Sequence, residues 1–176
     1  MLPDPLDAVD LDIYAGAKLP WSRVREALAA LPRPETPLFL STVGPDGRPH
    51  SAGVGCVEHE GGVFFTSGPA TRKSRHLAAN PACTLSLRLP GVDLVLEGEA
   101  RRATEPDVLA RVAALYREHG WPAEPDGDAI TAPYSAQSAG PPPWHLFRFG
   151  LRTAVGVALT APHGATRWRF PWRSEG

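Results

Sequence analysis

Short apolar runs separated by dense clusters of turn-forming residues constrain the fold of this chain more than any other feature. The chain has 20 prolines and 17 glycines among 176 residues, and they cluster between the apolar runs. Glycine and proline in such positions mark tight turns between strands, not a disordered chain. We therefore expect short antiparallel strands at residues 38–43, 50–60, 63–66, 83–89, 94–103, 144–159 and 166–170. The first three should form a meander, with a hairpin at Gly61-Gly62.

Three stretches have helical periodicity instead. Residues 21–31 offer Ser22 as a cap and Pro32 as a stop, and residues 71–80 end at Asn80-Pro81. The clearest helix is expected at residues 105–119, between Thr104 as N-cap and Gly120. Because few parallel crossovers are predicted, the pattern favours a mainly β (α+β) fold, an antiparallel barrel with helices at its ends.

Two segments stand outside this pattern. Residues 1–20 are expected to form a loosely attached leader, followed by one domain at residues 21–170 and a short tail at 171–176. Residues 121–143 are rich in proline and alanine and have no clear period, which is typical of a lid, an interface loop or a disordered segment. Trp121, Ile130 and Tyr134 favour the lid or interface loop, because they give it apolar groups to pack.

Composition limits the function classes. The formal net charge of -1 offers no basic field for nucleic acid or an anionic membrane, so any anion site must be local. No apolar run is long enough to cross a bilayer, and the acidic start is not a signal peptide, so a cytoplasmic protein is expected. Cys56 and Cys83 are expected to be buried free thiols, and no cysteine–histidine cluster indicates a metal site.

The most informative segment runs from Thr66 to His76, where a strand ends and a helix begins. A helix N-terminus offers unpaired amides and partial positive charge, and Thr71 and Ser74 add hydroxyls. Arg72 and Lys73 add cations, which oppose the helix dipole unless an anion lies among them. This composition fits a phosphate site, although a solvated basic helix face explains the local pattern equally well.

Two further features favour the phosphate site. The preceding strand contains small residues, Ser51, Ala52, Gly53 and Gly55, which allow a flat ring to approach the backbone. Near the C-terminus, Arg167 and Arg169 lie on one face of a strand and Trp168 on the other. The arginines either reach an anion or guard an exposed sheet edge.

The order of these segments resembles the FMN-binding split-barrel family of pyridoxamine 5'-phosphate oxidase-like proteins, over residues 21–170. The strongest part is the spacing of Lys73, Leu77, Asn80 and Pro81. The resemblance implies a six-stranded split β-barrel with peripheral helices, which forms a homodimer with cofactor sites between the subunits. The extended motif that holds the substrate phosphate of true pyridoxamine phosphate oxidases is missing. The resemblance therefore does not imply that this chain oxidises vitamin B6.

Carried onto this sequence, the resemblance implies FMN-binding residues in three groups. These are His50, Ser51, Ala52, Gly53 and Val54 beside the ring, Thr66, Ser67, Thr71, Arg72, Lys73 and Ser74 around the phosphate, and Trp168 and Arg169 from the C-terminal region.

The expected function is that of a flavin-dependent oxidoreductase acting on a small organic substrate, with the flavin supplying the redox chemistry. No catalytic residue is nominated, and His50, His76 and His145 are candidates by their chemistry alone. One alternative is a reductase of the same fold that uses a deazaflavin. The other is a non-enzymatic flavin- or haem-binding protein.

Overall fold

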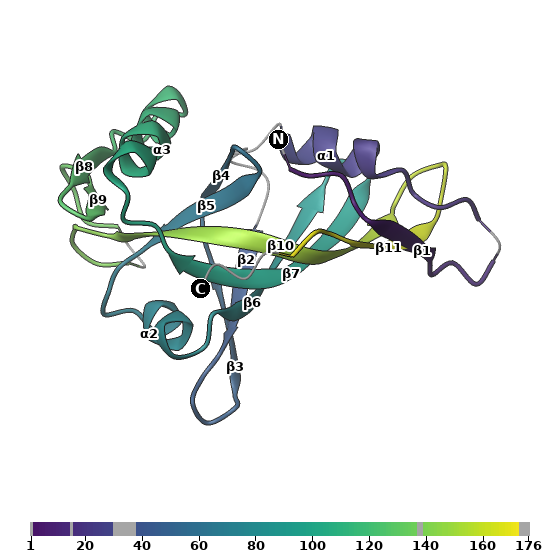
Figure 1. The fold of residues 1–176 in the computed structure, drawn as a ribbon, viewed down its shortest axis with the longest axis horizontal. Helices are drawn as coiled ribbons and strands as arrows, with labels where there is room; N and C mark the ends of the chain where they lie inside the picture. The colour runs from purple at the N-terminus through teal and green to yellow at the C-terminus, as the bar shows by residue number, and fades with distance from the viewer. Residues whose placement is uncertain (1, 15, 30–37, 137–138, 173–176) are drawn as a thin grey trace.

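Nine strands form one antiparallel sheet that curls without closing (Figure 1). The computed structural model describes residues 2–14, 16–29, 38–136 and 139–172. The sheet order is β1-β11-β10-β7-β6-β2-β3, and β5 pairs with both β4 and β10. These strands are β1 (Asp7–Asp10), β2 (Leu38–Val43), β3 (Pro49–Gly53), β4 (Cys56–His59), β5 (Gly62–Ser67), β6 (Ala82–Leu89), β7 (Val92–Arg102), β10 (His145–Ala158) and β11 (Ala165–Arg169).

The helices lie at the edges of the sheet (Figure 1). They are α1 (Trp21–Ala29), α2 (Arg72–Ala79) and α3 (Pro106–Glu118). A small hairpin of β8 (Glu124–Asp126) and β9 (Ala129–Thr131) follows α3. This is the split-barrel architecture that the sequence predicts, and all three expected helices are present in the described residues.

The long strand β10 splits the barrel. It pairs with β7 along its length, while its other edge pairs first with β5 and then with β11. The register against β7 shifts between Leu151 and Thr153, where a bulge bends the strand. Arg152 lies at this shift.

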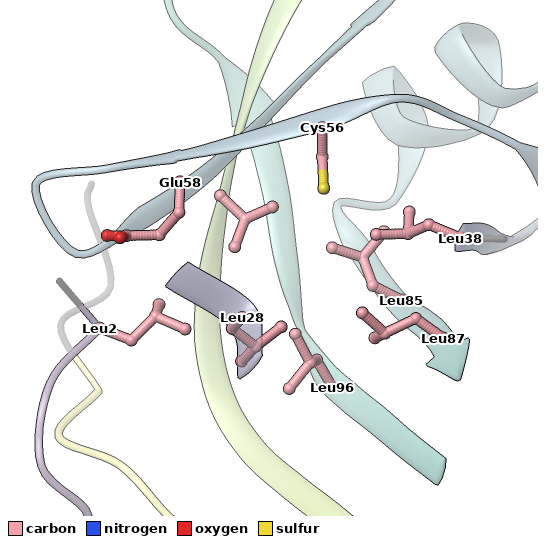
Figure 2. Close-up of a pocket in the computed structure, with 9 residues that line it drawn as sticks. Leu2, Leu28, Leu38, Cys56, Glu58, Leu85, Leu87 and Leu96 are labelled. Carbon is pink, nitrogen blue, oxygen red and sulfur yellow. The ribbon is translucent and has the colours of Figure 1, made fainter. Parts of the chain in front are cut away.

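Leucines fill the inside of the barrel. Leu38, Leu85, Leu87 and Leu96 project toward Cys56, while Leu2 and Leu28 close the space from the N-terminal side (Figure 2). Burial raises the pKa of both Cys56 and Cys83 to about 12, and both are free thiols, as predicted. A second apolar cluster lies under α3 and includes Leu109, Val112, Tyr116 and Ile130.

Two expectations are wrong. The leader is not loosely attached, because β1 pairs with β11 from Asp7↔Arg169 to Asp10↔Thr166 and Leu2 and Leu19 are buried. The expected strand at residues 50–60 is two strands interrupted at Val54-Gly55, so β3 pairs with β2 and β4 pairs with β5 instead of forming one meander. With β1 and the β8–β9 hairpin, the described residues contain more strands than the seven expected ranges, and the split-barrel architecture is the one predicted.

The ends of the helices differ from prediction only slightly. Helix α1 already begins at Trp21, so Ser22 lies within its first turn, and the expected stop at residues 31–32 lies outside the described residues. Helix α3 takes Glu105 as its N-cap, one residue after Thr104. Helix α2 has Thr71 as N-cap and Asn80 as C-cap, in agreement with its predicted bounds.

Candidate functional site

The turn between β5 and α2 is held by three hydroxyl groups that contact one another. Thr71 Oγ1 lies 2.8 Å from Ser67 Oγ and 3.1 Å from Ser74 Oγ, and Ser74 Oγ donates to Ser67 Oγ at 2.7 Å. Thr71 also caps the helix, because its hydroxyl accepts from the Ser74 amide at 3.3 Å. Ser67 and Ser74 are buried, so this hydroxyl triangle of Ser67, Thr71 and Ser74 fixes the shape of the turn.

Lys73 projects from the first turn of α2 into the interior. It is only 5% exposed, and none of the described residues forms a hydrogen bond or ion pair with it. Burial lowers the pKa of its ammonium group, because the charged form loses hydration. A buried ammonium group without a partner is unfavourable unless an anion compensates it. Arg72, the residue before it, is exposed at the surface.

A cavity of about 230 Å³ opens beside Lys73. On one side it meets the break between β3 and β4, where Gly53 and Gly55 leave open space at the positions that a Cβ would take. Thr66, at the end of β5, also lines it. The structure thus brings Gly53, Val54, Thr66 and Lys73 together, four of the residues that the sequence predicts to bind a cofactor.

Strand β3 leads toward this cavity with alternating faces. Ser51 lies on the outer face, where its hydroxyl is 2.7 Å from Ser41 Oγ on β2. His50 lies on the other face, with its ring 5.9 Å from the ring of His76 on α2. The pKa of His50 is lowered by burial and then by the positive charges of Arg72, His76 and Lys73. His50 therefore reports a region of positive potential around the start of α2.

Helix α3 and the segment after it form the opposite wall of the cavity. Tyr116 and Trp121 line it, with Ala136 and Ala139 further along the chain. The Trp121 ring lies 4.6 Å from Tyr116 and 5.6 Å from Trp144, so it is fixed by neighbouring rings. The sequence did not predict that these residues line the site. For Trp121, its position directly after Gly120, at the end of a helix, was the one local feature that could have indicated it.

Residues 121–143 pack onto the site in their described part. Ala123, Ile130 and Ala132 are buried, and Ile130 pairs with Trp144. A Cβ at Gly68 would lie 2.1 Å from the Ala139 carbonyl oxygen, so only glycine permits this close approach. The segment is therefore an ordered wall over these residues, not a disordered loop.

The C-terminal residues lie elsewhere. Trp168 is 1% exposed and packs against Trp21, 5.3 Å between ring centroids, so its ring belongs to the core. Arg169 is exposed on the opposite face of β11 and forms an ion pair with Asp7. Within one chain, the structure does not bring Trp168 or Arg169 to the cavity.

Two negative findings apply to the described residues. No helix is long and apolar enough to cross a membrane. No three histidine, cysteine, aspartate or glutamate side chains gather where they could hold a metal ion.

Comparisons with known proteins agree with this architecture. Among solved structures, a pyridoxamine 5'-phosphate oxidase-related, FMN binding protein from Nostoc punctiforme is 17% identical, with a TM-score of 0.56 over 88% of this chain and 90% of that one. An F420 reductase is 20% identical, with a TM-score of 0.50 over 74% of this chain and 94% of that one. A heme binding protein from Mycobacterium smegmatis is 16% identical, with a TM-score of 0.53 over 74% of this chain and 51% of that one. These likenesses define the class as the split-barrel fold.

Sequence comparison defines the family. The family model for pyridoxamine 5'-phosphate oxidase matches residues 24–154. A curated pyridoxine/pyridoxamine 5'-phosphate oxidase from Burkholderia lata is 36% identical over 118 residues, which are 65% of this chain and 51% of that protein. The chain thus spans about half the length of this relative. It belongs to the pyridoxamine 5'-phosphate oxidase family.

Proposed function

We propose that this protein binds FMN at the cavity beside Lys73 and acts as a flavin-dependent oxidoreductase on a small organic substrate. The observation that carries the proposal is Lys73 itself, a buried lysine that lines the cavity and has no hydrogen-bond or ion-pair partner among the described residues. A phosphate supplies the charge that this group lacks, and FMN is a phosphorylated flat-ring molecule of the kind that small-residue strands accommodate.

The residues present fit the two ends of such a ligand. Lys73, the exposed Arg72 and the free amides of the α2 N-terminus offer charge and donors to the phosphate. The hydroxyl triangle orients this turn, because its three oxygens already satisfy one another. Gly53, Val54 and Gly55 offer a flat backbone surface to the ring. When bound, the flavin would supply the redox chemistry, and these side chains would hold and orient it.

A homodimer belongs to the same proposal. The outer face of the sheet carries exposed apolar side chains on three strands, Phe39 on β2, Val95 on β7 and Val157 on β10, with β6 between β2 and β7. Arg169 lies on this face as well, beside Thr153 in the register of β10 and β11. A second copy packed here would bury the apolar residues and bring Arg169 of one subunit toward the other.

A deazaflavin is the second candidate, and the spread of positive charge favours it. Arg72 and Arg75 extend the charge of the turn outward from buried Lys73, where a longer anionic tail would run. The F420 reductase similarity is of fold alone.

The test is a titration of the purified protein with FMN and, separately, with the deazaflavin F420, followed by absorbance. We expect FMN to bind in the micromolar range or tighter and F420 to bind more weakly. If reduced nicotinamide transfers its electrons to the bound flavin, the result supports an oxidoreductase. If no electron donor reduces the bound flavin, the result supports a non-enzymatic carrier. A protein that takes up neither ligand contradicts the proposal.

A further inference from the structure

The wall formed by α3 and Trp121 defines which molecule can meet the cofactor. We propose that the substrate is an uncharged, planar organic molecule that packs against the Trp121 indole. This inference rests on the FMN binding proposed above and adds the substrate class. It follows from the charges, the rings and the hydroxyl groups that line the cavity.

Charge is the first argument. Lys73 is the one charged residue among the described residues that line the cavity, which are Gly53, Val54, Gly55, Thr66, Lys73, Tyr116, Trp121, Ala136 and Ala139. Once Lys73 neutralises the cofactor phosphate, no second charge in this set remains for a substrate anion. A phosphate or carboxylate enclosed there would lose its hydration without a charge-assisted partner, which is strongly unfavourable.

The rings are the second argument. Trp121 is half-buried: its edge meets Tyr116 at an interplanar angle of 79°, and a tilted Trp144 lies behind it. Trp144 is itself buried and its indole nitrogen donates to the Gly140 carbonyl at 3.2 Å. This packing holds the Trp121 ring in place while part of it faces the cavity, which suits stacking on a flat apolar molecule.

The Tyr116 hydroxyl does not alter this chemistry. It donates to the Phe64 carbonyl at 3.3 Å, and burial raises its pKa, so it stays protonated and engaged in the wall. Thr66 is then the one side-chain hydroxyl of this lining that forms no hydrogen bond within the part of the chain that the structure describes. The curated relative is named for phosphorylated substrates, and the lining of this cavity favours molecules without that phosphate.

A matched pair of aromatic probes tests the inference. Protein loaded with FMN is titrated with 1-naphthol and with 1-naphthyl phosphate, which differ by the phosphate, and binding is followed by the change in the flavin absorbance spectrum. We expect 1-naphthol to bind at least about tenfold more tightly. Trp121→Ala should weaken 1-naphthol binding about tenfold, whereas Trp121→Phe should stay within about threefold of the original protein.

Trp172 provides the control, because it packs under Arg152 at 4.9 Å and does not line the cavity. Trp172→Ala should leave 1-naphthol binding unchanged. If Trp121→Ala does not fold, the probe preference and Trp121→Phe still decide the question.

The outcomes separate the two proposals. A protein that binds FMN but prefers 1-naphthyl phosphate, or a Trp121→Ala variant that binds 1-naphthol normally, overturns the substrate class alone. A protein that takes up no FMN overturns the proposed function and this inference with it.

Discussion

Two short basic segments of this chain look alike in sequence and differ in structure. Lys73, at the start of α2, is buried beside a cavity, and no described residue pairs with it. Arg169, on β11, is exposed and already paired with Asp7, whose carboxylate has its pKa lowered by that hydrogen bond. The difference teaches that a run of basic residues indicates a binding site only where burial leaves a charge without a partner.

The largest expected effect comes from removing the Lys73 charge. Lys73→Met should weaken FMN binding about a hundredfold, because a buried charge-assisted contact contributes about 2–3 kcal/mol. Isothermal titration calorimetry measures the dissociation constant of FMN for both proteins. Arg111→Met is the matched control, since Arg111 is an exposed cation on α3 that does not line the cavity, and it should bind FMN normally. Equal losses in both variants would mean that the loss does not come from the position of Lys73.

The ionisation of Lys73 should make FMN binding depend on pH. Burial lowers the pKa of Lys73 below its ordinary value of 10.5, and a phosphate favours the charged form. FMN affinity should therefore fall as the pH rises through the lowered pKa, while the stability of the FMN-free protein rises over the same interval. Fluorescence titrations from neutral pH upward measure the affinity. Lys73→Arg keeps its charge, so in that variant the fall should disappear. If FMN affinity fell equally with pH in Lys73→Arg, the pH dependence would come from a group other than Lys73.

The hydroxyl triangle should affect stability more than binding. Ser74→Ala removes the two hydroxyl contacts that Ser74 makes, and leaves Ser67 and Thr71 paired with each other. We expect the free energy of unfolding to decrease by about 0.5–1.5 kcal/mol, as measured by urea denaturation. Ser22→Ala, at an exposed position of α1, is the control and should change it little. An unchanged stability in Ser74→Ala would mean that the triangle does not hold the turn.

The smallest effect is expected at Arg169. If Arg169 meets the cofactor of a second copy, Arg169→Met should weaken FMN binding about threefold, because this cation is exposed and shared with Asp7. Analytical ultracentrifugation of the same variant should still show a dimer. A loss as large as that of Lys73→Met would make the two basic segments equivalent.

The sequence predicts what local signals determine. Thr71 and Asn80-Pro81 mark the bounds of α2, and alternating residues mark β2 and β6, so these elements were predictable. The pairing of Asp7 with Arg169 joins residues 162 positions apart, and nothing near Asp7 signals it.

The candidate site divides in the same way. Lys73 and Gly53 are recognisable from the composition of their own segments. Tyr116 and Trp121 reach the cavity because α3 packs onto β4 and β5, which is a property of the tertiary fold. The burial of Trp168 is also a property of the tertiary fold. The alternation of residues along the strand predicts the face on which Trp168 lies, but it does not predict that α1 covers this face.

The most direct test of the central claim compares FMN with riboflavin, which lacks the phosphate. If buried Lys73 holds the phosphate, the original protein should bind FMN about a hundredfold more tightly than riboflavin, and Lys73→Met should bind the two about equally. Equal affinities in the original protein, or a preference for FMN that survives Lys73→Met, would contradict the account.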